Sequence, residues 1–418
     1  MLLINCDRFK HVNVSHGTAV GDELLKLMAG RVNGNIRLDD VVAMTTRPQH
    51  TAGRLGGDEF VLLIEHLRQA EDVHAVVQRL LDALAKPYGI GAHQLHAGAS
   101  IGVVLRAQAS DNADLVLQFA GIAMREAKRA GGGRYSVFDL QMKERAQRRG
   151  NTEADLRRAL DEHQLFVAYQ PILDLADRRC VSIEALVRWR HPTRGIVPPI
   201  EFIEIAEETG LIGGLGDFVL QEATTQLARW QQLLGADAPQ TMSVNVSRAQ
   251  LGEADLVARV RHALTRNGLC ASQLQLEITE SLATQDEGVR SRLVELKALG
   301  ILIALDDFGT GYSSLACLHQ MPVDVVKIDR SFVSQAETSP HHGVLIEATV
   351  RVAQSLGMHT VAEGIETEGQ ARLLTQLCCD KGQGYLFARP LPADEATQWL
   401  VERRSDAAPP AARVSRTR

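Results

Sequence analysis

Residues 183–192 read Ile-Glu-Ala-Leu-Val-Arg-Trp-Arg-His-Pro, and this stretch decides the fold of the C-terminal part of the chain. Its apolar residues predict a strand that carries an acid, Glu184, and an arginine, Arg188. These two residues are four apart, so the two-residue period of a strand places both side chains on one face. Pro192 ends the strand, because proline lacks the backbone N–H that a ladder needs.

Later apolar runs repeat this arrangement. Each brings a polar or charged residue to its end: Asn245, Glu277, Asp306 with Asp307, Lys327, Glu363 and Gln383. The carboxyl ends of the strands of a β/α barrel meet at one mouth, and active sites form there. Carboxylates, an amide and a lysine gathered at such a mouth predict metal-assisted phosphate chemistry.

The composition is that of a globular protein with more than one domain. The chain has 418 residues, of which 45% are hydrophobic and 23% are charged. Its net charge of −6 gives no reason to expect nucleic acid as a partner, so an anionic substrate needs metal ions or placed arginines. Six cysteines without a CxxC pair fit a reducing cytoplasm. No apolar run is long enough for a signal peptide or a membrane span, so we expect no membrane partner.

An α/β pattern occupies the first 138 residues. Extended runs are predicted at 1–9, 96–105 and 135–138, and helices at 21–28, 71–85 and 112–130. Residues 54–64 form two extended runs around Gly56-Gly57, which is typical of a hairpin because a tight turn requires positive φ. After a basic segment at 139–150, Thr152 and Asp155 predict the N-cap of a new helix.

The rest of the chain predicts a barrel. Strands at 165–175 and 180–189 are joined by too few residues for a parallel crossover, so this pair is antiparallel. Further strands are expected at 241–247, 274–279, 301–306, 324–328, 358–363 and 383–387, and helices at 200–208, 216–234, 253–267, 286–299, 313–319, 342–356 and 368–377. The predicted fold class is α/β: an N-terminal α/β domain, then a (β/α)8 barrel of the TIM type with one antiparallel strand.

The strand-end oxygens predict a metal site. Four residues offer the hard ligands that suit magnesium or manganese: Glu184, Asn245, Glu277 and Asp306. The adjacent carboxylates of Asp306 and Asp307 repel each other unless cations lie between them, which is typical of a two-metal site for phosphodiester cleavage. The alternative is a surface acid pair or a helix cap. The run Phe308-Gly-Thr-Gly-Tyr312 that follows favours a loop.

Lys327 ends the run Val325-Val-Lys-Ile-Asp329. Because it faces carboxylates and cations, we expect a lowered pKa that lets its amine orient or deprotonate a water. The alternative is a structural salt bridge to Asp329 or a neighbouring acid. Arg188 is expected to bind a phosphate just outside the metal cluster.

Taken together, these motifs resemble the EAL family of cyclic di-GMP phosphodiesterases over residues 155–400. The matching motifs are Glu184-Ala-Leu-Val-Arg-Trp189, Asn245-Val-Ser247, Glu277-Ile-Thr-Glu280, Asp306-Asp-Phe-Gly-Thr-Gly-Tyr-Ser-Ser314, Lys327-Ile-Asp329, Glu363-Gly-Ile-Glu366 and Gln383-Gly-Tyr385. The resemblance implies a barrel with one antiparallel strand. It also implies hydrolysis of cyclic di-GMP to linear pGpG with two magnesium or manganese ions.

The resemblance further implies a role for each matching residue. One metal would be held by Glu184, Asn245, Glu277 and Asp306, and the second by Asp306, Asp307 and Glu363. The catalytic residues would be Lys327, which positions the attacking water, with Glu363 and Glu184. The dinucleotide would contact Gln170, Leu186, Arg188 and Gln383. Glu280 would organise the 307–314 loop, which couples the site to dimerisation, so a homodimer through the barrel is expected.

The N-terminal part resembles a GGDEF (diguanylate cyclase) domain. Gly56-Gly-Asp-Glu-Phe60 is intact, and four further positions match: Phe9, Lys10, Asn13 and Asp22. The family's lead-in is missing before Met1, so a truncated domain is expected. Four residues depart from the family pattern. Asn5 replaces a metal-binding Asp, and His50 replaces the Asp that would accompany Arg47 in the product-inhibition motif. Gly121 replaces an Asp, and Gly132 replaces a phosphate-binding Arg.

These departures predict a degenerate domain without useful cyclase activity, because Asn5 weakens the two-carboxylate clamp on the metal. Two alternatives remain for it: a GTP pocket that regulates the barrel, or a structural remnant that aids dimerisation. The expected domains are 1–140, a linker at 141–154, the barrel at 155–402 and a disordered tail at 403–418. For the whole chain, the alternatives to a phosphodiesterase are a non-catalytic cyclic di-GMP receptor and a bifunctional cyclase–phosphodiesterase.

Overall fold

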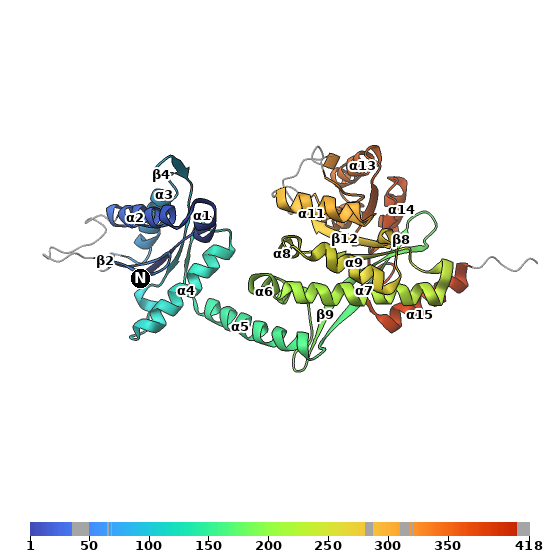
Figure 1. The fold of residues 1–418 in the computed structure, drawn as a ribbon, viewed down its shortest axis with the longest axis horizontal. Helices are drawn as coiled ribbons and strands as arrows, with labels where there is room; N and C mark the ends of the chain where they lie inside the picture. The colour runs from blue at the N-terminus through green and yellow to red at the C-terminus, as the bar shows by residue number, and fades with distance from the viewer. Residues whose placement is uncertain are drawn as a thin grey trace, which may run out of the picture. The chain divides into compact units, whose positions relative to one another are not determined.

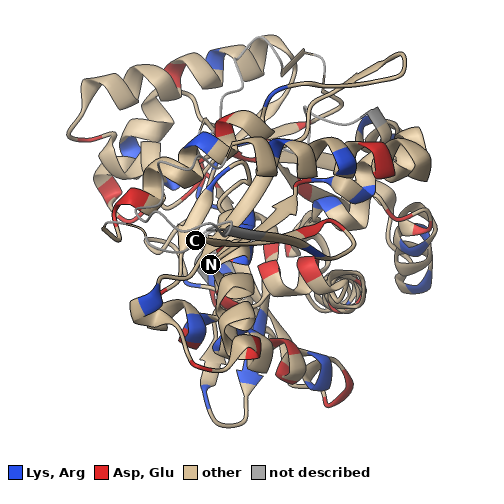
Figure 2. Ribbon diagram, turned by 90° about the vertical axis from the view of Figure 1, so that its left-hand side faces the viewer, with Lys and Arg blue, Asp and Glu red and all other residues tan. Residues whose placement is uncertain are grey.

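The computed structural model describes residues 1–35, 50–64, 67, 69–280, 287–309, 318–319 and 321–407. The chain forms two compact units, Met1–Asn151 and Thr152–Arg418. Within the described ranges no helix is long and apolar enough to cross a membrane. Basic and acidic residues are interspersed along the helices (Figure 2), so attraction of an anion has to come from groups at a particular site.

The first unit is built on a five-stranded sheet in the order β2-β3-β1-β6-β7. Its strands are β1 (Leu2–Cys6), β2 (His50–Gly56), β3 (Glu59–Ile64), β6 (Ala99–Val103) and β7 (Tyr135–Val137). Its helices are α1 (Phe9–His16), α2 (Thr18–Gly34), α3 (Asp72–Leu84) and α4 (Ala113–Arg129). Leu2 and Ile4 pack against α1, α2 and α3, whereas Leu3 packs against α4 on the other face. All five residues of β1 are therefore buried.

The predicted α/β pattern and hairpin are confirmed, with differences in detail. The tight turn falls on Gly57 and Asp58, one residue later than expected, because Gly56 still pairs with Glu59. Helix α1 and a small hairpin of β4 (Tyr88–Ile90) and β5 (His93–Leu95) were not predicted. Arg47 lies outside the described residues.

The second unit contains a closed barrel of eight strands. They follow one another around the barrel as β8 (Leu165–Asp174), β9 (Cys180–His191), β11 (Thr241–Asn245), β12 (Leu274–Thr279), β13 (Leu302–Phe308), β14 (Val325–Ile328), β15 (His359–Ala362) and β16 (Lys381–Gly382). β8 is antiparallel to both of its neighbours, β9 and β16, and the other neighbouring pairs are parallel. The predicted barrel with one antiparallel strand is therefore confirmed. Two short strands, β10 (Gly195–Val197) and β17 (Leu391–Pro392), pair with β9 and β8.

Helices cover the outside of the barrel (Figure 1). They are α6 (Ile203–Thr209), α7 (Ile212–Leu234), α8 (Arg248–Leu251), α9 (Leu256–Asn267), α11 (Glu287–Ala298), α12 (Arg330–Gln335), α13 (Pro340–Ser355), α14 (Glu368–Gln376) and α15 (Ala393–Ala407). Outward-facing strand residues such as Leu276 and Ile303 pack against these helices in the main core. The strands read as nearly continuous apolar runs because both of their faces are buried.

Four predictions about the chain beyond residue 138 need correction or cannot be compared. The last barrel strand is Lys381–Gly382, so Gln383 follows the strand instead of starting one at 383–387. Helix α5 (Leu140–Asp161) runs unbroken through the expected linker and past Thr152, where a new helix was predicted to start. The tail expected from residue 403 is helical up to Ala407. The helix predicted at 313–319 lies mostly outside the described residues.

Candidate active site

The barrel brings the predicted strand-end residues to one mouth. Asn245 lies level with Glu277 across β11 and β12, and Thr279 lies level with Asp306 across β12 and β13. Lys327 comes from β14, and Glu363 follows β15. Parallel strands have their carboxyl ends on the same side, so these side chains converge.

Lys327 lies at the centre of this group. Its side chain is 1% exposed, and its Nζ atom is 2.6 Å from Glu277 Oε2 and 2.6 Å from Glu363 Oε1. The same atom is 3.0 Å from Asp306 Oδ1, without hydrogen-bond geometry, and 3.6 Å from Glu184 Oε2. Within the described part of the chain Lys327 forms no ion pair with Asp329, whose carboxylate accepts a hydrogen bond from the backbone N–H of Ser331 at the start of α12. The other form of that alternative, a salt bridge to a neighbouring acid, is present at Glu277 and Glu363.

The expected lowering of the Lys327 pKa is also wrong. Burial disfavours the ammonium form, but the surrounding carboxylates, with Glu184 and Glu277 first, outweigh burial and raise the pKa of Lys327 well above its usual value. Burial has the opposite effect on the acids: it raises the pKa of Glu277 well above its usual value, and it raises the pKa of Glu363 to about 7. The lysine therefore stays positively charged.

Glu184 is held by amides. Its Oε1 accepts a hydrogen bond from Asn245 Nδ2 (2.8 Å), and its Oε2 accepts one from Gln383 Nε2 (2.7 Å). Gln383 Nε2 also donates to Gln170 Oε1 at 2.9 Å. Burial favours the neutral acid, but Lys327 and these amides lower the pKa of Glu184 overall. Glu184 therefore stays ionised.

A bulge in β13 brings two adjacent acids to the same side. Neighbouring residues of a regular strand face opposite sides, but the register to β14 shifts between Leu305 and Phe308, and Asp307 has φ of 53°. Carboxylate oxygens of Asp306, Asp307 and Glu363 consequently lie within 4.8 Å of one another, as metal ligands do. Burial and the charge of Asp306 raise the pKa of Asp307.

Two of the residues predicted to contact substrate line the strand next to this cluster. Leu186 and Arg188 are half-buried on β9. Arg188 donates a hydrogen bond to the carbonyl of Val187 (2.8 Å), and burial lowers its pKa. By contrast, Gln170 and Gln383 are 8% and 4% exposed and belong to the network around Glu184.

Glu280 lies at the base of the loop it was predicted to organise. Its Oε2 accepts a hydrogen bond from the backbone N–H of Gly309 (3.0 Å). Gly309 has φ of 100°, and a Cβ atom there would come within 2.8 Å of the Phe332 ring, so this position requires glycine. Residues 310–317 of the same loop lie outside the described part of the chain.

Sequence reasoning missed two buried polar residues below the cluster, Gln275 and Ser243. Gln275 Nε2 donates to Ser243 Oγ at 2.8 Å and to Glu277 Oε1 at 3.4 Å. A signal was present, because Gln275 interrupts the apolar run of β12 two residues before Glu277 and so shares its face.

In the first unit, Asn5 at the end of β1 and Asp7 just after it differ in their contacts. Asn5 is 4% exposed, and its Oδ1 atom is buried without a hydrogen-bond partner among the described residues. Across β1 and β3, Asn5 lies opposite Glu59. Both oxygens of Asp7 accept hydrogen bonds, from Ser100 Oγ (2.6 Å) and from the backbone N–H of Gly133 (2.8 Å).

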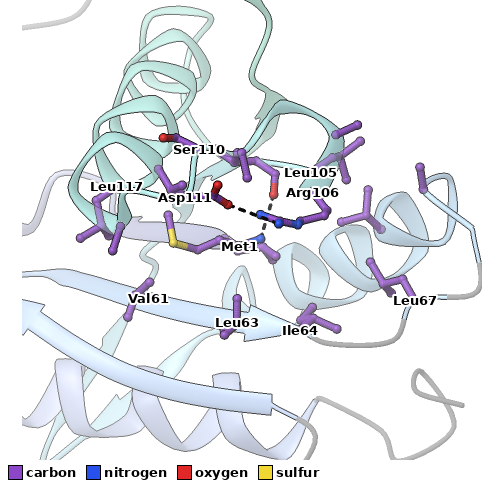
Figure 3. Close-up of a pocket in the computed structure, with 18 of the residues that line it drawn as sticks. Met1, Val61, Leu63, Ile64, Leu67, Leu105, Arg106, Ser110, Asp111 and Leu117 are labelled. Atoms are coloured by element: carbon purple, nitrogen blue, oxygen red, sulfur yellow. Dashed lines mark hydrogen bonds and ion pairs between the residues drawn. The ribbon is translucent and has the colours of Figure 1, made fainter. Parts of the chain in front are cut away.

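The first unit also contains an apolar cleft of about 1000 Å³ (Figure 3). Residues of β1, β3 and α4 line it, among them Met1, Val61, Leu63 and Leu117. The Met1 amino group donates a hydrogen bond to the carbonyl of Val104 (2.8 Å). None of the described residues lining the cleft is a predicted site residue, so the cleft is separate from the acidic cluster of the barrel.

Comparison with known proteins agrees with this division of the chain. Residues 153–390 match the family model of the EAL domain, and residues 1–134 match that of the diguanylate cyclase, GGDEF domain. The bifunctional diguanylate cyclase/cyclic di-GMP phosphodiesterase MucR of Pseudomonas aeruginosa is 39% identical over 396 residues, which is 94% of this chain and 56% of that protein. The cyclic di-GMP phosphodiesterase NbdA of the same organism is 39% identical over 411 residues, which is 98% of this chain and 51% of that protein.

Solved structures resemble the barrel in particular. The phosphodiesterase PaMucR in complex with c-di-GMP is 41% identical with a TM-score of 0.56, covering 59% of this chain and 99% of that one. The EAL enzyme Bd1971, bound to cAMP and cyclic di-GMP, is 27% identical with a TM-score of 0.60, covering 74% of this chain and 82% of that one. The chain spans about half the length of the two curated relatives. Since the EAL model alone matches more than half of its residues, the chain belongs to the EAL family, and a GGDEF domain precedes its EAL domain.

Proposed function

We propose that this chain hydrolyses cyclic di-GMP to linear pGpG at the carboxyl end of its barrel. The observation that carries this proposal is the buried Lys327 with carboxylates from four different segments within 3.6 Å of its amine. The names of the relatives MucR, NbdA and PaMucR support the choice of substrate.

The chemistry of the donor set fits divalent cations. Five carboxylates share this mouth with one lysine: Glu184, Glu277, Asp306, Asp307 and Glu363. Two of them, Glu184 and Glu277, are buried, and carboxylates this close repel one another unless protons or cations compensate their charge. Oxygen ligands select magnesium or manganese. We assign one ion to Glu184, Asn245, Glu277 and Asp306 and the other to Asp306, Asp307 and Glu363.

When bound, two such ions supply an activated water and neutralise charge on the scissile phosphate. The protein residues keep this geometry in place. Lys327 holds Glu277 and Glu363 by 2.6 Å contacts and, as an ammonium group, orients the attacking water by donating a hydrogen bond. Glu363, which accepts one of these contacts, and Glu184 are the other two residues that we propose as catalytic.

The substrate is held beside the cluster. Arg188 lies four residues beyond Glu184 on the same strand and offers a fork of N–H donors to a phosphate oxygen. Leu186, between them on the same face, offers an apolar contact to a base. We keep Gln170 and Gln383 as substrate contacts, and their hydrogen bonds add a second role, which is to orient Glu184.

We propose that the GGDEF domain makes no cyclic di-GMP. Asn5 supplies an amide where a metal needs a carboxylate, and the Asp7 carboxylate is already engaged by Ser100 and Gly133. The domain then serves as a GTP-responsive module or as a structural part of a homodimer. We further propose domain limits of 1–140 and 155–402 and a cytoplasmic location.

One assay tests the main proposal. Purified protein is incubated with cyclic di-GMP and Mg²⁺ or Mn²⁺, and the products are separated by chromatography. We expect linear pGpG, and no product with Glu184→Ala. Binding of cyclic di-GMP without turnover in either metal would instead identify a receptor.

A further inference from the structure

We propose that Gln275 is a positioning residue that fixes the carboxylate of Glu277 in the orientation in which it binds a divalent cation. This inference rests on the function proposed above. It concerns the layer of the barrel interior immediately below the acidic cluster.

The strand geometry places Gln275 in that layer. The side chains of Leu274, Leu276 and Ile278 belong to the main core outside the barrel strands. Because side chains alternate along a strand, Gln275 and Glu277 point to the other side, into the barrel. The pairing of β11 with β12 brings Ser243 level with Gln275.

The contacts give the two oxygens of Glu277 different partners. Oε2 is 2.6 Å from Lys327 Nζ, whereas Oε1 is 3.4 Å from Gln275 Nε2. Ser243 Oγ accepts a second hydrogen bond from the same amide nitrogen at 2.8 Å, which fixes the direction of the amide. A carboxylate held at both oxygens cannot turn about its last bond, so its lone pairs keep one direction.

Burial makes this arrangement effective. Gln275 is 4% exposed, Ser243 is 0% exposed and Glu277 is 1% exposed. Water is therefore a poor substitute for the amide. Partners of metal-binding carboxylates generally tune the affinity of a site, and losing one costs about 10- to 100-fold in metal affinity or activity.

Ser182 offers a matched control. It is a buried polar residue on β9, two positions before Glu184, as Gln275 is two positions before Glu277. Its hydroxyl donates a hydrogen bond to the carbonyl of Thr241 (3.1 Å) and accepts one from the Thr241 hydroxyl (2.7 Å). Ser182→Ala therefore perturbs the buried interior of the barrel one level below Ser243, without removing a donor to Glu277.

The test measures Mn²⁺ binding directly, by the loss of the electron paramagnetic resonance signal of free Mn²⁺ on titration with protein. Gln275→Met keeps the side-chain volume and removes the donor. We expect its Mn²⁺ affinity to fall about 10-fold or more, and that of Ser182→Ala to stay within a few-fold of the parent. At saturating Mn²⁺ the kcat of Gln275→Met should largely return, because the ligand itself is intact.

Equal Mn²⁺ affinity for Gln275→Met and the parent would overturn the inference while leaving the proposed function standing. Failure of the parent itself to bind Mn²⁺ would overturn the proposed function and this inference with it. If Gln275→Met does not fold, Ser243→Ala decides, because it releases the amide of Gln275: weaker Mn²⁺ binding supports the inference, and unchanged binding overturns it.

Discussion

Replacing Lys327 with methionine should destabilise the metal-free barrel far more than the metal-loaded one. The lysine is the positive charge among four carboxylates, with three contacts of 3.0 Å or less. Removing one partner of a buried ion pair typically costs about 3–5 kcal/mol, because the remaining charge is left uncompensated. For a domain of this size about 1 kcal/mol corresponds to roughly 2–4 °C in Tm, so we expect a loss of about 6–20 °C.

Divalent cations should reverse much of this loss, because they neutralise the same carboxylates. The assay is thermal unfolding of the parent and of Lys327→Met at pH 8, in EDTA and in saturating Mn²⁺. The Tm gain on adding Mn²⁺ should be larger for the variant. In turnover with Mn²⁺ the variant should lose roughly 10²-fold or more in kcat, as loss of a placed proton-transfer or water-orienting group does.

A lysine that serves packing alone gives a different result. It predicts equal Tm losses with and without Mn²⁺ and a kcat per folded molecule close to that of the parent. Either finding would refute the proposed role of the ammonium group. Lys297→Met is a suitable control, because Lys297 pairs with a single carboxylate, Asp324, at 2.5 Å.

Three further predictions concern the carboxylates, the substrate and the first domain. The pKa of Glu363 is raised from 4.5 to about 7, so between these values the folded state holds a proton that the unfolded state has lost. Stability without metal should therefore fall as pH rises through this window, and Mn²⁺ affinity should rise by up to about 10-fold per unit. Glu363→Gln should weaken this pH dependence without abolishing it, because Glu277 and Asp307 also have raised pKa values, and an unchanged pH profile would contradict the role of Glu363. Arg188→Ala should raise KM for cyclic di-GMP with little change in kcat, since it removes a phosphate contact outside the cluster, and a pure kcat effect in steady-state kinetics would contradict that role. Labelled GTP should give no labelled cyclic di-GMP with Glu184→Ala, in which breakdown is blocked, and accumulation of product would show that Asn5 does not disable the first domain.

The fold was predictable because several local signals agree. The few residues between 175 and 180 exclude a parallel crossover, and the structure has β8 antiparallel to both neighbours. Alternating apolar runs and helical patterns then leave a barrel as the simplest closure. The position of the last strand was missed because β16 has only two residues, too few to show the two-residue period of a strand. The apolar residues within 383–387 suggested a strand there, but this segment follows β16 and forms a turn.

Which residues gather at the mouth of the barrel was predictable, but the electrostatics of that cluster were not. A residue at a strand end is recognisable from sequence, since the apolar run stops there. The sign of the pKa shift of Lys327 depends on how many carboxylates lie within a few ångströms, and that number is a property of the closed barrel. Burial alone would have lowered this pKa; four acids reverse the sign.

The convergence of Asp306 and Asp307 shows what a sequence pattern leaves open. Adjacent residues on a regular strand point in opposite directions, so the shared metal site expected for this pair requires an irregularity that the Asp-Asp pattern does not specify. The bulge between Leu305 and Phe308, with Asp307 in the left-handed region, turns both carboxylates toward Glu363. Bulges occur next to active sites because they re-aim a side chain, and the strain of a non-glycine residue at positive φ is tolerated where the surroundings impose it. The bulge therefore brings together carboxylates that repel one another without a cation and that we propose as its ligands.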